Sequence, residues 1–202
     1  MYKKPLIVFE GIEGSGKTTH INFVAKLLKK RKKKFIKIRE PGGVKNSEKI
    51  RKMILSNKSN FNNLTDLFLY MAARSENIEK LISKNYKKRI ILVDRFTDST
   101  MAYQHYGMGI NKKLIIQLNK IILKNIKPTF TFLNTVNMKN LQSRVNKRAK
   151  NRYDNFNNNF YKKVQNGFIK LAKNKKNYKI IDSNLSIEKN KKLIIKKINS
   201  LL

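Results

Sequence analysis

The chain has 202 residues, of which 47 are Lys or Arg and 12 are Asp or Glu, so its formal net charge is +35. The absence of cysteine excludes a disulfide-stapled scaffold, a cysteine-ligated zinc site and a catalytic thiol. With 40% hydrophobic residues and no apolar run as long as a membrane span, the composition also argues against a disordered or transmembrane chain. We therefore expect a single soluble, cytoplasmic domain that covers residues 1–202.

Short apolar runs alternate with longer amphipathic stretches. Runs rich in β-branched and aromatic residues predict strands at Leu6–Phe9, Phe35–Ile38, Ile90–Val93, Thr129–Leu133 and Tyr178–Ile181. Apolar residues three and four apart predict helices at about 17–31, 47–57, 64–84, 111–125, 137–149, 156–174 and 186–202. The Asn-rich segment 151–159 breaks this spacing and predicts a mobile surface loop. Because strands alternating with helices form parallel sheets covered on both faces, we expect a three-layer α/β/α fold with a parallel five-stranded core sheet.

A glycine-rich loop joins the first predicted strand to the first predicted helix. Its sequence is Gly11-Ile12-Glu13-Gly14-Ser15-Gly16-Lys17-Thr18, which matches G-x-x-x-x-G-K-[ST]. Glycines let the backbone N–H groups turn inward, so that phosphates meet a nest of donors at a helix N-terminus. Lys17 is placed to reach the β- and γ-phosphates, and Thr18 to hold Mg²⁺ through its hydroxyl. The loop therefore predicts a P-loop NTPase fold that binds a nucleoside triphosphate.

The end of the third predicted strand indicates a second phosphate site. Asp94 and Arg95 directly follow Val93, and ligands of open α/β sheets bind at the carboxyl ends of strands. Asp94 is placed to reach Mg²⁺, and Arg95 to face the phosphate of a second substrate. The string Asn-Lys-x-Asp, with which GTPases read guanine, is absent. We therefore expect a phosphoryl transferase.

Several further segments carry selective motifs. In chain order they are Phe9–Thr19, Arg39–Gly43, Glu48–Arg51, Leu67–Arg74, Asp94–Gln104 and Asn151–Asp154. In their order and spacing they resemble those of bacterial thymidylate kinases, from one end of the chain to the other. The resemblance implies transfer of the γ-phosphoryl group of ATP to dTMP, giving dTDP and ADP, with Mg²⁺ as cofactor. It also implies a homodimer.

The resemblance implies a pocket for the base and sugar of dTMP. Tyr70 would stack on the thymine, and Arg74, four residues further on the same helix face, would donate to a base carbonyl. Thr100 would meet the ring N–H, while Tyr103 and Gln104 would pack against the deoxyribose. The full dTMP-binding set expected is Glu40, Arg51, Tyr70, Arg74, Arg95, Ser99, Thr100, Tyr103 and Gln104.

The same resemblance assigns the phosphates. Arg95 and Arg51 would clamp the monophosphate, because two guanidinium groups suit a dianionic phosphate. Glu13 matches an acidic position that contacts the acceptor nucleotide and metal-bound water. Glu40 precedes Pro41 in a turn where the family tends to hold an unusual peptide bond. The metal ligands expected are Thr18 and Asp94.

A flexible lid over ATP is implied at about residues 144–156. The glycine-rich loop carries Glu13, Gly14 and Ser15 where some family members have an arginine, so the lid would supply that arginine. The candidates are Arg144, Arg148 and Arg152, of which Arg152 fits the family pattern best. The expected catalytic set is then Lys17, Arg95, Arg152 and Glu13.

Two alternatives compete with this interpretation. The acceptor could be another nucleotide or a deoxynucleoside, although a nucleoside would not need paired arginines. The charge of +35 could instead indicate a P-loop protein that binds nucleic acid. However, the Lys-rich clusters 29–34 and 173–176 lie at predicted helix ends and carry no interleaved aromatic residues. We therefore expect no specific nucleic-acid partner and no membrane partner, but attraction of anionic substrates.

Overall fold

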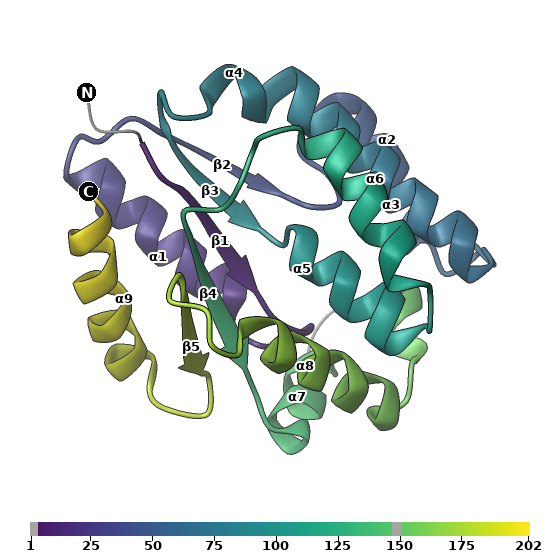
Figure 1. Ribbon diagram of the computed structural model, residues 1–202. Coiled ribbons are helices and arrows are strands. Elements are labelled where there is room, and N and C mark those ends of the chain that lie inside the picture. Colours follow the sequence, from purple (N-terminus) through teal and green to yellow (C-terminus); the bar gives the residue numbers. More distant parts are fainter. Residues whose placement is uncertain (1–3, 147–150) are drawn as a thin grey trace.

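The structure is a computed structural model that describes residues 4–146 and 151–202. A parallel sheet forms its centre, with strand order β2-β3-β1-β4-β5 (Figure 1). The strands are β1 Leu6–Glu10, β2 Phe35–Arg39, β3 Ile90–Asp94, β4 Phe130–Thr135 and β5 Tyr178–Asp182. In register, Val8 of β1 lies between Val93 of β3 and Thr131 of β4. The predicted parallel five-stranded sheet is confirmed, with each strand running one or two residues past its predicted end.

Helices cover both faces of the sheet, so the predicted three-layer fold is also confirmed (Figure 1). They are α1 Lys17–Lys30, α2 Lys45–Leu55, α3 Asn63–Asn77, α4 Ser83–Asn85, α5 Thr97–Thr100, α6 Lys112–Leu123, α7 Met138–Val145, α8 Asn158–Ala172 and α9 Ile187–Leu201. The described residues also form two π-helical segments, η1 Ile78–Ile82 and η2 Met101–Gly107, and the 3-10 helix η3 Arg152–Asn155.

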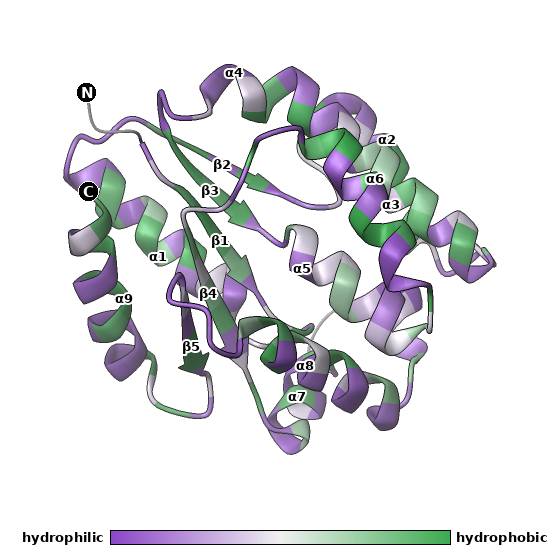
Figure 2. Cartoon of the chain, viewed as in Figure 1, coloured by the Kyte–Doolittle hydropathy of each residue, from purple (hydrophilic) through white to green (hydrophobic). Residues whose placement is uncertain are grey.

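Alternation along the strands divides the core between the two faces. Ile7 and Phe9 of β1 pack against α1 and α9, whereas Leu6 and Val8 pack toward η1. Both sets are buried, since each face of a parallel sheet is covered. Figure 2 shows the result as strands that are predominantly hydrophobic between helices with one polar side. Because β3, β1 and β4 are adjacent and parallel, their carboxyl ends lie side by side at the same end of the sheet. The loops that follow these strands therefore start close together.

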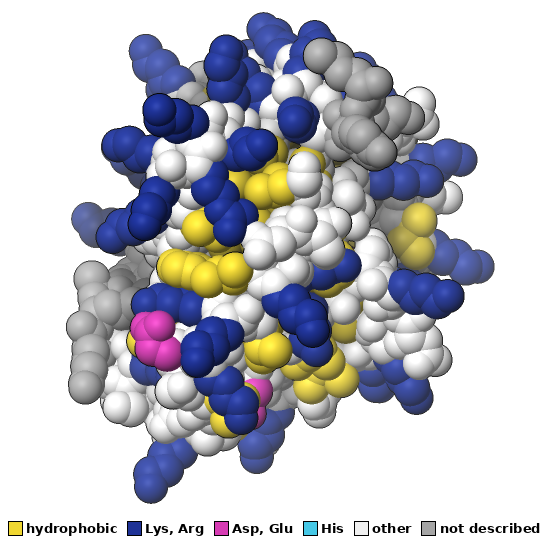
Figure 3. Space-filling view, turned by 90° about the vertical axis from the view of Figure 1, so that its left-hand side faces the viewer, with side chains coloured by type: hydrophobic (Ala, Val, Ile, Leu, Met, Phe, Trp, Pro, Cys, Tyr) yellow, Lys and Arg dark blue, Asp and Glu magenta, His cyan; other side chains and the backbone are white. Residues whose placement is uncertain are grey.

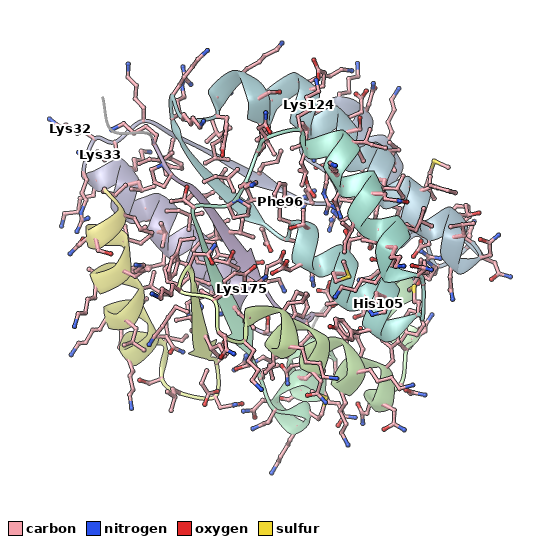
Figure 4. The ribbon with its side chains drawn as sticks, viewed as in Figure 1. Lys32, Lys33, Phe96, His105, Lys124 and Lys175 are labelled. Atoms are coloured by element: carbon pink, nitrogen blue, oxygen red, sulfur yellow. The ribbon has the colours of Figure 1, made fainter. Side chains whose placement is uncertain are left out.

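The segment between β3 and α6 is helical, which the sequence did not predict. It forms α5 and η2, and both Phe96 at its start and His105 within it are labelled in Figure 4. Helical spacing was hidden here because Ser99, Thr100 and Gln104 are polar yet buried. Polar residues buried on a helix face are typical of a functional site rather than of a surface helix.

The Asn-rich segment was wrongly predicted as a loop. Asn151 caps η3 in a capping box with Asp154, and Asn157 caps α8 by accepting from the Phe160 N–H. Asparagine is favoured in turns and at helix N-caps for the same reason, since its side chain accepts from a nearby backbone N–H. The asparagines of segment 151–159 are therefore as compatible with helix N-termini as with a loop.

Lys and Arg side chains are spread widely over the face that carries α1 and α9 (Figure 3). Within residues 4–146 and 151–202, no helix is long and apolar enough to cross a membrane. Arg148, one of the predicted lid arginines, lies outside the described residues.

Candidate active site

The glycine-rich loop turns tightly between β1 and α1. Gly11 has φ +137°, and a Cβ there would lie 2.2 Å from the backbone oxygen of Asn134 on β4, so only glycine fits. Gly16, at φ +85°, is the residue before α1. The loop therefore presents the N-terminus of a fourteen-residue helix to the cleft, an arrangement suited to phosphate.

Lys17 folds back over this loop. Its Nζ donates to the backbone oxygen of Ile12 at 2.7 Å, and the side chain is buried. Burial, together with the positive charge of Arg95, lowers the pKa of Lys17 to about 8, although Glu13 and Asp94 oppose the shift. A bound polyphosphate would offset this shift, because a neighbouring anion favours the charged amine.

Thr18 and Asp94 meet beside the loop. The Thr18 hydroxyl donates to Asp94 Oδ2 at 3.2 Å, while Asp94 Oδ1 is buried without a hydrogen-bond partner in the described part of the chain. One hydroxyl and one carboxylate with a free oxygen fit Mg²⁺, which usually takes one or two protein oxygens and completes its shell with phosphate and water. No cluster of three His, Asp or Glu side chains suited to a metal occurs among residues 4–146 and 151–202.

Arg95 connects the loop to the opposite side of the cleft. Its backbone has φ +67°, a left-handed conformation that is uncommon for a residue with a side chain. Its guanidinium donates to the Gly11 oxygen at 2.9 Å and pairs with Glu13 at 2.7 Å. Strained backbone at such a position is held only where the surrounding structure fixes it.

Glu10 fixes that turn, a role that sequence reasoning missed. Its buried carboxylate accepts from the backbone N–H groups of Phe96 at 2.8 Å and Ser99 at 3.2 Å, and from the Ser99 hydroxyl at 2.5 Å. Burial, and then Asp98, raise the pKa of Glu10 to about 7, which the bonds from Ser99 and Phe96 partly offset. The only sequence signal was an acid at the end of an otherwise apolar strand.

A cleft of about 600 Å³ opens between the loop and α3. The predicted site residues that line it are Glu13, Gly14, Gly16, Lys17, Thr18, Glu40, Arg51, Tyr70, Asp94, Arg95, Ser99, Tyr103 and Gln104. The structure thus brings together residues that are more than ninety positions apart in the chain. Gly11, Ile12, Ser15, Arg74, Thr100 and Arg152 are the predicted site residues outside this lining.

Arg74 lies behind the cleft wall rather than in it. Its guanidinium pairs with Glu40 at 2.7 Å and donates to Asn119 on α6 at 2.8 Å and to the Phe96 oxygen at 2.9 Å. Both members of the ion pair are almost fully buried, at 2% and 4% exposure. The Glu40–Pro41 peptide is cis, which confirms the predicted unusual bond. Arg51 donates to the Pro41 oxygen at 2.6 Å and so fixes the same turn.

The two described lid arginines point to different places. Arg144 on α7 donates to the Gly14 oxygen at 3.0 Å and the Ser183 oxygen at 2.8 Å, beside the glycine-rich loop. Arg152, preferred from the sequence, instead donates to the Ile54 oxygen at 3.0 Å and pairs with Asp66. The structure does not bring Arg152 to the loop, because the buried carboxylate on α3 engages its guanidinium.

A polar wall on the β4 and β5 side also escaped the sequence analysis. His20, which lines the cleft, lies 2.6 Å from the Asn134 amide through its Nδ1, and the Ser183 hydroxyl donates to the Ser15 oxygen at 2.6 Å. Burial lowers the pKa of His20, which favours the neutral ring. No local motif marks these residues, since they come from three separate segments.

Comparison with known proteins gives one consistent family. The family model described as thymidylate kinase matches residues 9–194. Thymidylate kinases of Thermosipho africanus and Sulfurihydrogenibium are 37% and 38% identical to the chain, covering 90% and 94% of it and 91% and 94% of their own length. A crystal structure of thymidylate kinase from Ehrlichia chaffeensis superposes with a TM-score of 0.79 at 31% identity, covering 98% of this chain and 99% of that one.

Proposed function

The chain belongs to the thymidylate kinase family, and on that premise we propose how the residues of its cleft share the work of the reaction. The enzyme is an ATP-dependent nucleoside monophosphate kinase that transfers the γ-phosphoryl group of ATP to dTMP, giving dTDP and ADP. We divide the cleft into a donor half, residues 11–18, and an acceptor half, formed by Arg51, Tyr70, Arg95, Tyr103 and Gln104.

The donor half holds ATP mainly through its backbone. Amides of the loop and the N-terminus of α1 face the phosphates, and Lys17 supplies a positive charge to the β- and γ-phosphates. We assign the lid arginine at this side to Arg144 rather than Arg152, because, of the two lid arginines that the structure describes, Arg144 is hydrogen bonded to Gly14. Thr18 and Asp94 would hold Mg²⁺, which neutralises phosphate charge when bound.

The acceptor half holds dTMP through side chains. Arg51 and Arg95 clamp the monophosphate, the Tyr70 ring stacks on the base, and Tyr103 and Gln104 contact the sugar. Two predicted dTMP-binding residues lie outside the lining of this pocket. They are Arg74, which holds Glu40 in place, and Thr100, whose hydroxyl has no hydrogen-bond partner in the described part of the chain.

The position of Arg95 carries this assignment. Its guanidinium lies 2.9 Å from the Gly11 oxygen of the donor loop while its side chain lines the acceptor half. A phosphate bound there lies next to the γ-phosphate site, so that the two reacting groups are held close together. Glu13, paired with Arg95, fixes the direction of the guanidinium and lies at the boundary of the two halves.

The direct test is ADP release from Mg-ATP with dTMP, dUMP, UMP, CMP, AMP or GMP as acceptor at equal concentration. We expect fast turnover with dTMP, slower turnover with dUMP and almost none with the others. Turnover with none of them, in a protein that still binds ATP, would contradict the acceptor half while leaving the donor half intact.

A homodimer is also proposed. Leu64 and Phe68 on α3 and Ile116 on α6 are exposed large apolar side chains on neighbouring helices, which is typical of a protein interface. Light scattering that gives the mass of a 23.7 kDa monomer at micromolar concentration would contradict this. The cytoplasmic location stays a prediction.

A further inference from the structure

Asp66 is a buried acid that the proposed roles do not use. It lies in the first turn of α3, four residues before Tyr70 and eight before Arg74, so that all three project from one side of the helix. Its side chain is 2% exposed. Burying a carboxylate without partners costs free energy of folding. The groups that bind the Asp66 carboxylate therefore indicate its role.

Both carboxylate oxygens of Asp66 bind side chains of η3. Oδ1 pairs with the Arg152 guanidinium, and Oδ2 accepts from the Tyr153 hydroxyl. Arg152 also donates to the Ile54 oxygen at the end of α2, and its guanidinium carbon lies 5.5 Å from the centre of the Phe61 ring. Asp66 thus fastens η3 to the helix that carries the base-stacking tyrosine.

Tyr153 connects Asp66 to the cleft, because its hydroxyl donates to Asp66 and its side chain lines the cleft. It is 3% exposed yet lines the cleft, and its ring stands edge-on to Tyr70 at 6.1 Å and to Tyr103 at 5.8 Å between ring centres. The Gln104 amide lies 3.5 Å from the Tyr153 hydroxyl. Tyr153 therefore touches the three side chains assigned to the base and sugar of dTMP.

The backbone of η3 is held independently of Asp66. Asn151 and Asp154 form a capping box, and the Tyr161 hydroxyl donates to the Tyr153 oxygen at 2.9 Å. Loss of the Asp66 charge should consequently leave the segment folded but free the Tyr153 and Arg152 side chains. Such a change alters the wall of the pocket without removing it.

We propose that Asp66 is a positioning residue for the acceptor site, which acts by holding Tyr153 as a wall of the dTMP pocket. The proposal rests on the assignment of Tyr70, Tyr103 and Gln104 to the acceptor half. It also assigns a role to Arg152, which is the cation that balances the charge of the buried Asp66 carboxylate. The hydrogen bonds that the structure gives for the Arg152 and Tyr153 side chains go to Asp66, Ile54 and Gln104, so we expect the donor half to depend little on Asp66.

The test is steady-state kinetics of Asp66→Asn, which keeps the shape and removes the charge. KM for dTMP should rise about tenfold, the loss expected for one charge-assisted hydrogen bond, with kcat and KM for ATP within about twofold of the parent enzyme. Tyr153→Phe, which keeps the ring, should raise KM for dTMP about threefold, and the double variant should be no worse than Asp66→Asn alone. Glu76→Gln, at an exposed ion pair on the same helix, is the matched control and should change nothing.

Several outcomes would overturn the proposal. An unchanged KM for dTMP in Asp66→Asn would do so. A fall in kcat together with equal rises in KM for dTMP and for ATP would also do so, because it indicates a purely structural role. If Asp66→Asn does not fold, an unchanged KM in Tyr153→Phe contradicts the proposal. Turnover of dTMP by the parent enzyme is measured in the same series, so failure of the proposed acceptor pocket would be seen separately.

Discussion

The donor half of the cleft comes from one continuous loop, whereas the acceptor half gathers side chains from four separate segments. In the donor half the proposed binding groups are backbone amides and the Lys17 amine, in a loop whose glycines have positive φ angles. In the acceptor half they are large side chains, held by the ion pairs Arg95–Glu13, Arg74–Glu40 and Arg152–Asp66. The donor half depends on backbone conformations that glycine allows, and the acceptor half depends on buried ion pairs. The two halves should therefore respond to different substitutions.

The largest effect is expected where a buried charge loses its partner. Glu40→Ala leaves the Arg74 guanidinium buried and unpaired, and should lower the free energy of unfolding by about 3–5 kcal/mol. Urea unfolding measures this. Glu79→Ala, which breaks an exposed ion pair with Lys124, is the control and should cost less than about 1 kcal/mol. Equal losses in the two variants would mean that buried charge does not hold the acceptor half.

A smaller effect is expected from backbone strain in the donor half. Gly16→Ala places a side chain at φ +85° and should cost about 1–2 kcal/mol of stability. Gly109→Ala, at φ +80° with nothing within 4 Å, should cost the same and serves as a control outside the cleft. Only Gly16→Ala should weaken binding of an ATP analogue in calorimetry. If both variants bind the analogue alike, the loop backbone is not the binding group.

The smallest effect is expected from pH, and it should change ligand affinity in the donor half but not in the acceptor half. Lys17 has a pKa of about 8 in the free enzyme and loses its charge as the pH rises through that value. Affinity for an ATP analogue should therefore fall between pH 7 and pH 9, by at most about tenfold, since about a tenth of the amine stays protonated one unit above its pKa.

Affinity for dTMP should stay constant over the same range, because guanidinium groups remain charged. Titration calorimetry at several pH values measures both ligands on one protein. A dTMP affinity that falls in parallel with that of the ATP analogue would contradict the division into a lysine-based and an arginine-based half.

The same contrast explains how much could be predicted from the sequence. The glycine-rich loop was predictable from the sequence, because its glycines, Lys17 and Thr18 lie within eight residues and their spacing is the signal. The contacts of Arg144 and Ser183 beside that loop were not predictable in this way. The strands were predictable because β1, β3 and β4 are buried on both faces and read as apolar runs. The short helix α5 was not, since its buried residues are polar and no apolar period marks it.

The acceptor half was predictable only as a set of residues, not as an arrangement. Tyr70 was identified through a resemblance and Arg95 from its place after a strand, but the neighbours of both decide how they are used. Nothing local to Arg74 indicates that Asn119, 45 residues away, would accept from it. Likewise Arg152 was expected at the loop, whereas the single acid Asp66, 86 residues earlier, holds it elsewhere. Long-range ion pairs of this kind leave no periodic trace in a sequence.

The most direct test of the two-half account is calorimetric binding of dTMP and of a non-hydrolysable ATP analogue to Arg95→Ala. Arg95 lines the acceptor half but also touches the donor loop through Gly11. The account predicts that dTMP affinity falls about a hundredfold, as for loss of a charged phosphate contact, while affinity for the ATP analogue changes by less than about threefold. An equal loss for both ligands would contradict it.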